Sequence, residues 1–229
     1  MLEKRKKITK KQIKEDKLVT SYYTVKNFVL EYQAKILIGM AVVALVVVAG
    51  ILFANKSMND NKKAAGLLAK IIPLYEATAF KEAVDGQPSS NTIGLKSIVK
   101  EYGSSENGET AKIYLGNAYL MLGKSADAYK TFDDYSGSNP LFKSTALAAK
   151  AGILEANKEF DKAADLYKDA AMISKTNPAN ADYLLRAGII ILNSGKKEEA
   201  KTIFDMIKND YKNSAAFSEV DRYLIQIAS

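Results

Sequence analysis

The chain contains no cysteine, histidine or tryptophan among its 229 residues. Cysteine supplies thiol nucleophiles, histidine supplies the usual general base near neutral pH, and both are common zinc ligands. Their absence excludes disulfides, Cys/His zinc sites, Ser-His-Asp triads and haem held by histidine. Any catalysis would have to rest on carboxylates, lysines and hydroxyl groups, so the composition argues against an enzyme.

Two short motifs resemble catalytic or nucleotide-binding signatures. Residues 118–125 (AYLMLGKS) end like a phosphate-binding loop. That loop requires glycine where Ala118 stands and a strand before it, whereas a helix is predicted there. Ser97 and Lys100 have the S-x-x-K spacing of serine acyltransferases, but the companion motifs of those enzymes are absent. We therefore interpret the first motif as a turn between helices and the second as a helix surface.

The remaining candidates are two pairs of neighbouring carboxylates, Asp133 with Asp134 and Glu198 with Glu199. Adjacent residues on a helix point in different directions, so neither pair forms a catalytic dyad. The sequence thus predicts no catalytic residue, no cofactor-binding residue, no metal ligand and no small-molecule substrate.

The charge of the chain is concentrated at one end. The formal net charge is +7, and residues 1–35 carry ten basic against four acidic side chains. The remainder is nearly neutral, which argues against nucleic acid as a partner. Within 1–35, an apolar face recurs at helical spacing through Leu18, Tyr22, Val25 and Phe28. We expect a basic cytoplasmic tail with a juxtamembrane amphipathic helix beside an anionic leaflet.

Residues 36–54 form an uncharged apolar stretch, ILIGMAVVALVVVAGILFA. As a helix it spans roughly 29 Å, close to the thickness of a bilayer core. A cleaved signal peptide would have a shorter apolar region and a shorter leader, so we expect a retained transmembrane signal anchor. The basic tail favours a cytoplasmic N-terminus and an extracytoplasmic C-terminal domain. Residues 55–61 then form a polar neck, and 62–229 a helical domain.

Three windows of the C-terminal domain share a pattern of small and aromatic residues. Their equivalent alanines, Ala128, Ala163 and Ala200, are 35 and 37 residues apart. Small residues allow close helix contacts, and Gly123 and Gly195 stand where helices must end. The period and pattern resemble the tetratricopeptide repeat, a helix–turn–helix unit. We therefore predict an all-α fold, a tetratricopeptide-repeat helical solenoid of about three to four helix pairs tethered by one N-terminal transmembrane helix.

The ends of the domain depart from the pattern. We expect a degenerate first unit, with a helix kinked at Pro73 and a second helix over residues 91–102 (NTIGLKSIVKEY), separated by a loop at residues 85–90. Residues 217–227 should form a helix that caps the far end.

A stack of such helix pairs presents a concave surface built from the first helix of each unit. The repeat register predicts the residues of a protein-binding groove there, with Ala148 and Gly152 between them. The predicted groove residues are Thr110, Ile113, Asn117, Leu120, Thr145, Glu155, Asp182, Leu185, Ile189 and Leu192. The set is mainly apolar and lacks a basic clamp for carboxylates, so it favours apolar segments over acidic C-termini. Alternatively, terminal helices fill the groove.

The layout of basic tail, single anchor and short repeat domain resembles the YfgM-like ancillary subunits of the bacterial SecYEG translocon, and more closely the related single-anchor repeat proteins of Bacteroidetes-type bacteria. The most telling stretch is residues 111–140 (AKIYLGNAYLMLGKSADAYKTFDDYSGSNP), together with residues 221–224 (DRYL) of the last helix. The resemblance implies a single-pass protein of the bacterial inner (cytoplasmic) membrane with a periplasmic C-terminal domain. It also implies partners, namely the translocon, periplasmic chaperones and secreted client chains, besides the lipid bilayer.

We therefore expect a non-enzymatic, membrane-anchored interaction scaffold that links secreted chains to periplasmic chaperones. A scaffold for cell-envelope assembly, serving outer-membrane or cell-wall machinery, is the alternative that the same sequence features allow.

Overall fold

A computed structural model describes residues 10–228, and for residues 10–16 and 18 it describes the backbone alone. The basic run at residues 4–7 therefore lies outside the described residues, as do the side chains of Lys10, Lys11, Lys14 and Leu18. The described chain is predominantly helical. Its elements are α1 (Lys10–Glu76), α2 (Phe80–Asp85), β1 (Gly86–Gln87), a 3₁₀ turn (Pro88–Ser90), β2 (Thr92–Ile93), α3 (Leu95–Tyr102), α4 (Glu106–Met121), α5 (Ser125–Asp133), α6 (Pro140–Ala156), α7 (Phe160–Met172), α8 (Asn180–Asn193), α9 (Lys197–Asp210) and α10 (Ala215–Ala228).

The chain divides into two compact units, Met1–Lys56 and Ser57–Ser229. Helix α1 begins in the first unit and ends in the second, and it runs without interruption through residues 55–61. Among the described residues it is the one helix long and apolar enough to cross a membrane, and its apolar window is not buried by any other part of the chain. Pro73 lies inside the helix, three residues before its end.

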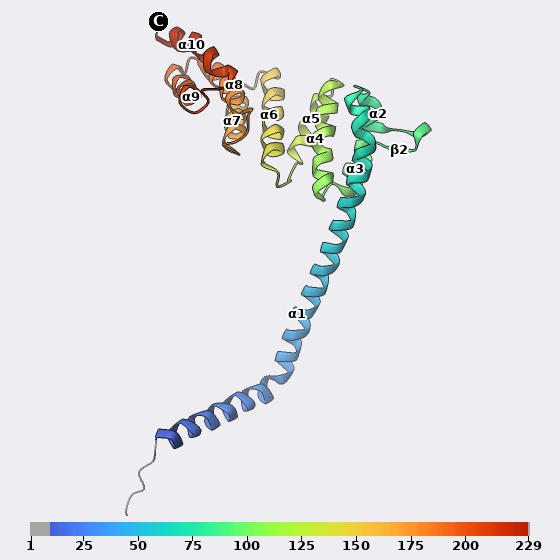
Figure 1. Ribbon diagram of the computed structural model, residues 1–229, viewed down its shortest axis with the longest axis vertical. Coiled ribbons are helices and arrows are strands. Elements are labelled where there is room, and N and C mark those ends of the chain that lie inside the picture. Colours follow the sequence, from blue (N-terminus) through green and yellow to red (C-terminus); the bar gives the residue numbers. More distant parts are fainter. Residues whose placement is uncertain (1–9, 229) are drawn as a thin grey trace, which may run out of the picture. The chain divides into compact units, whose positions relative to one another are not determined.

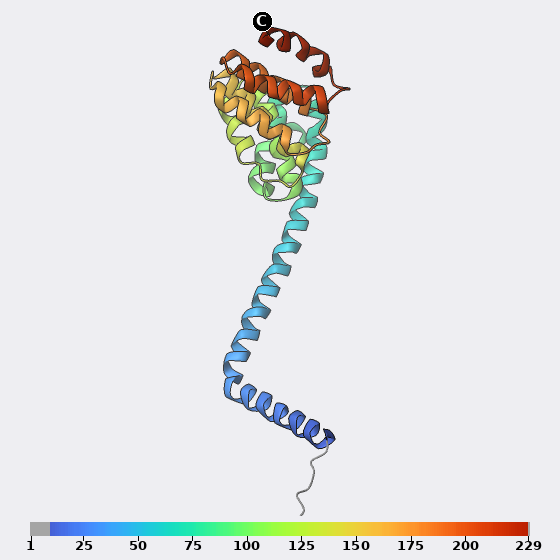
Figure 2. The same cartoon turned by 90° about the vertical axis from the view of Figure 1, so that its left-hand side faces the viewer.

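In the second unit, α4 with α5, α6 with α7 and α8 with α9 form three successive helix hairpins (Figure 1). Neighbouring helices pack in chain order, and α10 packs on α8 and α9 at the end of the stack (Figure 2). The prediction of an all-α tetratricopeptide-like solenoid is thus confirmed. Ala128, Ala163 and Ala200 are all fully buried, as expected for positions where two helices touch.

The three hairpin turns share one hydrogen-bond geometry. In the first, the N–H of Lys124 donates to the carbonyl of Tyr119 at 2.8 Å and that of Gly123 to Leu120 at 3.0 Å. This pair of bonds is the Schellman motif, which requires a left-handed residue after the helix. Gly123, Lys158 and Gly195 fill that position with φ of 71°, 67° and 80°. The second turn therefore has the same backbone as the others although a lysine replaces glycine.

The glycines of the first and third hairpins admit an aromatic ring from the partner helix. A methyl group on Gly116 would lie 2.6 Å from the ring of Phe132, and one on Gly188 would lie 2.4 Å from Phe204. Both rings are essentially buried. The aromatic side chain thus packs within its own hairpin, against the glycine, and holds the two helices together.

The degenerate first unit differs from the expectation for its second helix. Residues 91–102 do not form one helix, because Thr92 pairs with Gln87 and Ile93 with Gly86 in a short antiparallel hairpin. Helix α3 begins only at Leu95. The predicted loop at residues 85–90 is likewise replaced in part by this hairpin, which is drawn beside α2 in Figure 1. The reason is the tight contact of Gly94 with Gly86, where any side chain would clash with backbone atoms.

The end of α1 belongs to the core of this first unit. Ala64, Leu68 and Ile71 are buried at helical spacing in one hydrophobic cluster with residues of α2, α3 and α4. The side-chain amide of Asn107 on α4 donates to the Oδ1 atom of Asn61 at 2.8 Å, and its backbone N–H donates to the same oxygen at 2.7 Å. These bonds fix the start of the packed segment of α1 on α4.

Candidate protein-binding surface

The concave surface predicted from the repeat register is only partly continuous. A hollow of about 670 Å³ lies between α6 and α8. Of the predicted groove residues, Glu155, Asp182, Leu185 and Ile189 line it, and so do Ala148 and Gly152 between them. The register predicted that residues of the second and third windows share one face. In the structure, residues of both windows line the same hollow.

The remaining predicted residues lie outside this hollow. Ile113 and Leu192 are 5% and 7% exposed and belong to the hydrophobic core, which leaves little of either side chain for a partner. Thr110 lines a smaller hollow of about 280 Å³ beside Glu109 and the residues from Tyr135 to Asn139. Asn117, Leu120 and Thr145 are half-buried. The first window thus does not extend the hollow.

The floor of the hollow is apolar, and two of its residues are small. Ala148 and Gly152 on α6 face Leu185 and Ile189 on α8. Leu185 is 8% exposed and Ile189 is half-buried, so Ile189 offers the more accessible aliphatic surface. The floor thus combines small residues on α6 with larger aliphatic residues on α8.

Four lining residues were not among the predicted set: Tyr167, Tyr183, Arg186 and Glu219. Arg186 stands four residues after Asp182, and this helical spacing could have placed it on the same face. Tyr167 and Glu219 come from α7 and α10, whereas the prediction drew on the first helix of each unit alone. Helix α10 contributes Glu219 to the lining of the hollow.

A polar group of three side chains forms one wall. The hydroxyl of Tyr167 donates to Oε2 of Glu155 at 3.0 Å, and Nη1 of Arg186 lies 3.6 Å from the same oxygen. The guanidinium also lies over the Tyr167 ring, 6.0 Å from its centroid. Burial and the neighbouring carboxylate of Glu155 raise the pKa of Tyr167 to about 12. The tyrosine therefore remains a hydrogen-bond donor throughout the physiological range.

The other charged residues of the hollow are acidic. Asp182 lies in the first turn of α8 and has no ion-pair partner in the described part of the chain. Glu219 forms an exposed pair with Arg222, one turn further along α10. Burial also raises the pKa of Tyr183, against the opposing effect of hydrogen bonds with Thr145 and Asn177. Three carboxylates thus surround a hollow that holds one guanidinium.

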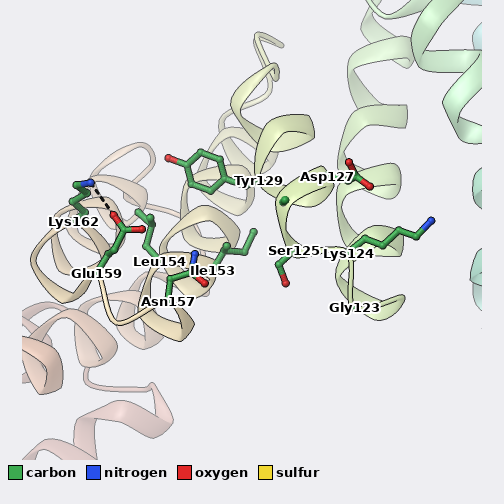
Figure 3. Close-up of a pocket in the computed structure, with 11 residues that line it drawn as sticks. Gly123, Lys124, Ser125, Asp127, Tyr129, Ile153, Leu154, Asn157, Glu159 and Lys162 are labelled. Carbon is green, nitrogen blue, oxygen red and sulfur yellow. Dashed lines mark hydrogen bonds and ion pairs between the residues drawn. The ribbon is translucent and has the colours of Figure 1, made fainter.

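A second, larger hollow of about 860 Å³ lies at the hairpin turns, between α5 and the junction of α6 with α7 (Figure 3). Its lining includes Lys124, Tyr129, Leu154 and the ion pair of Lys162 with Glu159 at 2.8 Å. None of the predicted groove residues lines it. Its lining holds two basic and two acidic side chains and is formally neutral.

Within residues 10–228 there is no cluster of three or more carboxylates that could hold a metal ion. The carboxylates of the Asp133–Asp134 and Glu198–Glu199 pairs are all on exposed residues.

Comparison with known proteins supports the helical repeat and does not indicate a more specific family. Residues 182–214 match the family model described as tetratricopeptide repeat, and this stretch comprises most of α8, all of α9 and the turn that follows. No curated protein and no solved structure matches the chain significantly. Tetratricopeptide repeats indicate protein partners. The resemblance to translocon subunits is not tested by these comparisons and stays a prediction.

Proposed function

We propose that this protein is a membrane-anchored, non-enzymatic scaffold that binds segments of other proteins in the hollow between α6 and α8. One observation carries the proposal. Residues of two successive repeats, Gly152 and Glu155 on α6 with Asp182 and Ile189 on α8, line one open surface that has an apolar floor and polar walls. Solenoids use such concave surfaces for recognition. The match to a tetratricopeptide-repeat model supports the same class of function.

The membrane anchor of this proposal is α1. Its apolar side chains are exposed, for example Leu45 at 70% and Phe53 at 75%, and exposed surfaces of this extent are unfavourable in water. A bilayer removes that surface from water. Tyr22 and Tyr32 stand on the N-terminal side of the stretch, where aromatic residues favour the headgroup region. We place the basic N-terminus in the cytoplasm and the repeat domain in the periplasm of a bacterial inner membrane.

Labelling of single cysteines tests this topology. The natural chain has no cysteine, so each probe reports one position. Ser57→Cys should react with an impermeant maleimide in spheroplasts, whereas Thr9→Cys should react only after lysis. Labelling of Thr9→Cys in intact spheroplasts would reverse the proposed orientation.

Within the periplasm, we propose that the scaffold is associated with the protein-translocation channel and passes secreted chains to chaperones. The combination of basic tail, single anchor and short repeat domain supports this role through its resemblance to ancillary translocon subunits. A hollow with an apolar floor and no basic clamp for carboxylates is also suited to chains that have not yet buried their hydrophobic segments. Crosslinks confined to outer-membrane or cell-wall assembly proteins would contradict this role.

Site-specific photocrosslinking tests the binding surface itself. A photoreactive residue at Ile189, on the floor of the hollow, should capture partner chains in the producing cell. The matched control is Glu198, an exposed residue of α9 that does not line the hollow. Equal capture at the two positions would show that partners bind elsewhere on the domain.

A further inference from the structure

The charges around the hollow specify the kind of segment that it accepts, and this inference rests on the proposed function. Three carboxylates line the hollow, those of Glu155, Asp182 and Glu219, and Arg186 is the one basic residue that lines it in the described part of the chain. The formal charge of the lining is therefore −2. An acidic partner segment would be repelled from such a surface, because like charges brought together are unfavourable.

The guanidinium of Arg186 is already engaged. It pairs with Glu155 at 3.6 Å and lies over the ring of Tyr167, whose hydroxyl donates to the same carboxylate. Glu155 and Arg186 thus balance each other within the wall of the hollow. The negative charge that remains open to a partner is that of Asp182, which has no ion pair among the described residues.

Glu219, on α10, adds to this charge. Its pair with Arg222 is exposed, spans one helical turn and involves a residue that does not line the hollow. Exposed pairs of this kind are weak and exchange readily for another cation. A basic side chain of a partner therefore finds one carboxylate without a partner and a second that is weakly held.

The apolar floor sets the other half of the specificity. Ala148 and Gly152 leave space opposite Ile189, and a methyl group on Gly152 would lie 3.3 Å from the Tyr167 hydroxyl. We infer that the hollow between α6 and α8 recognises a protein segment in which a lysine or arginine lies within one helical turn of an aliphatic residue, with the base at Asp182 and Glu219 and the aliphatic side chain at Ile189.

A peptide selection tests the inference. Full-length protein in nanodiscs of uncharged lipid is the bait for a phage library of random peptides. Selected peptides should be enriched in lysine or arginine close to an aliphatic residue. Against the double variant Asp182→Asn with Glu219→Gln, the aliphatic enrichment should persist and the basic enrichment should disappear. The control variant Asp169→Asn with Glu198→Gln removes the same charge from exposed positions outside the hollow and should select the same peptides as the natural protein.

Affinity measurements on one selected peptide give the magnitude. The double variant should weaken its Kd about five- to tenfold, because two exposed charge pairs are lost. The Kd for the natural protein should also weaken as salt is raised, since salt screens exposed charges, and the double variant should lose most of that dependence. Far-UV circular dichroism checks that both variants stay folded.

The possible failures are distinguishable. Aliphatic enrichment without basic residues, or selection of acidic peptides, would overturn the inference about charge and leave the proposed binding function standing. A selection that enriches no motif, or one that Ile189→Glu leaves unchanged, would overturn the binding function and the inference together.

Discussion

The second hairpin turn allows a direct test of why this repeat needs glycine. Lys158 occupies the left-handed position with φ of 67°, where the other two turns have Gly123 and Gly195. A residue with a side chain pays roughly 1–2 kcal/mol for that conformation. Glycine avoids this cost but loses about 0.5–1 kcal/mol more backbone entropy on folding. Lys158→Gly should therefore stabilise the domain by about 0.5–1 kcal/mol, which corresponds to a rise in Tm of about 1–4 °C.

The structure makes the reverse substitutions equally informative. A methyl group on Gly123 or Gly195 would meet no atom within 4 Å, so Ala at either position changes the backbone energy and no packing contact. Gly123→Ala and Gly195→Ala should each destabilise the domain by about 0.5–1 kcal/mol.

Thermal unfolding followed by circular dichroism, with the full-length protein in mild detergent, measures all four variants. Lys158→Ala is the matched control, because it removes the same charge while it keeps a side chain in the left-handed conformation. If Lys158→Gly melts no higher than Lys158→Ala, the proposed role of the backbone conformation is refuted.

Three further predictions concern packing and buried polar groups. Gly188→Ala should destabilise the domain by about 1–3 kcal/mol in denaturant unfolding, because its methyl group would lie 2.4 Å from the fully buried Phe204 ring. Burial alone would raise the pKa of Glu109, but hydrogen bonds from Lys112 and Ser136 outweigh burial and lower this pKa. The ionised carboxylate therefore stabilises the fold at pH values above the pKa of Glu109 in the unfolded chain. This stabilisation is lost as pH falls through the pKa in the folded chain. Glu109→Gln should cost about 2 kcal/mol at pH 7 and should flatten the acid limb of the stability profile. The pKa of Tyr167 is raised to about 12, so the neutral hydroxyl stabilises the fold below the unfolded pKa of about 10, and this stabilisation is lost as pH rises towards 12. Tyr167→Phe should therefore reduce the loss of Tm at alkaline pH.

Controls for these variants are available in the same chain. Gly66 lies on an exposed part of α1 with no atom within 4 Å of a methyl group, so Gly66→Ala should be stabilising where Gly188→Ala is not. Glu106→Gln changes an exposed carboxylate of the same helix as Glu109 and should leave the acid limb unchanged. Tyr22→Phe, at an exposed position of α1, is the matched control for Tyr167→Phe. A variant that behaves like its control would contradict the assigned contact.

The repeat could be predicted from sequence because its key residues are tied to backbone geometry. Glycine at the turn and small residues at helix crossings follow from steric limits that any helix hairpin meets. Ala128, Ala163 and Ala200 therefore marked buried contacts without any knowledge of the fold. The second turn lacks glycine, yet the periodicity on both sides of it was sufficient to place the helices.

The first unit and the concave surface could be predicted less well, because both depend on contacts between distant parts of the chain. The hairpin at Gly86 and Ile93 is fixed by the approach of Gly94 to Gly86, and the local strand propensity of these residues does not predict it. Register places Ile113 and Leu192 on the predicted face, but neighbouring helices cover them. A helical period identifies which residues share a face and not how much of that face remains open.

The polar wall of the hollow arises where the second unit departs from the repeat pattern. In the first and third hairpins, Gly116 and Gly188 each receive a phenylalanine ring. The equivalent residue of the second hairpin is Ala151, and the aromatic residue sixteen positions later is Tyr167. Glycine stands one position further on, at Gly152, where the absence of a side chain leaves room for the tyrosine hydroxyl 3.3 Å from where a methyl carbon would lie.

This shift has a functional consequence. Because the hydroxyl of Tyr167 reaches Glu155, that carboxylate is held beside Arg186. The pairing occupies the basic residue of the hollow and leaves Asp182 as the open charge. The tyrosine, which the fold itself does not require in place of phenylalanine, thereby helps to hold the one guanidinium of the lining at Glu155, so that the remaining charge of the hollow is negative. Tyr167→Phe should accordingly loosen the pair of Arg186 with Glu155, and the preference of the hollow for basic peptides should weaken in the same selection that tests Asp182.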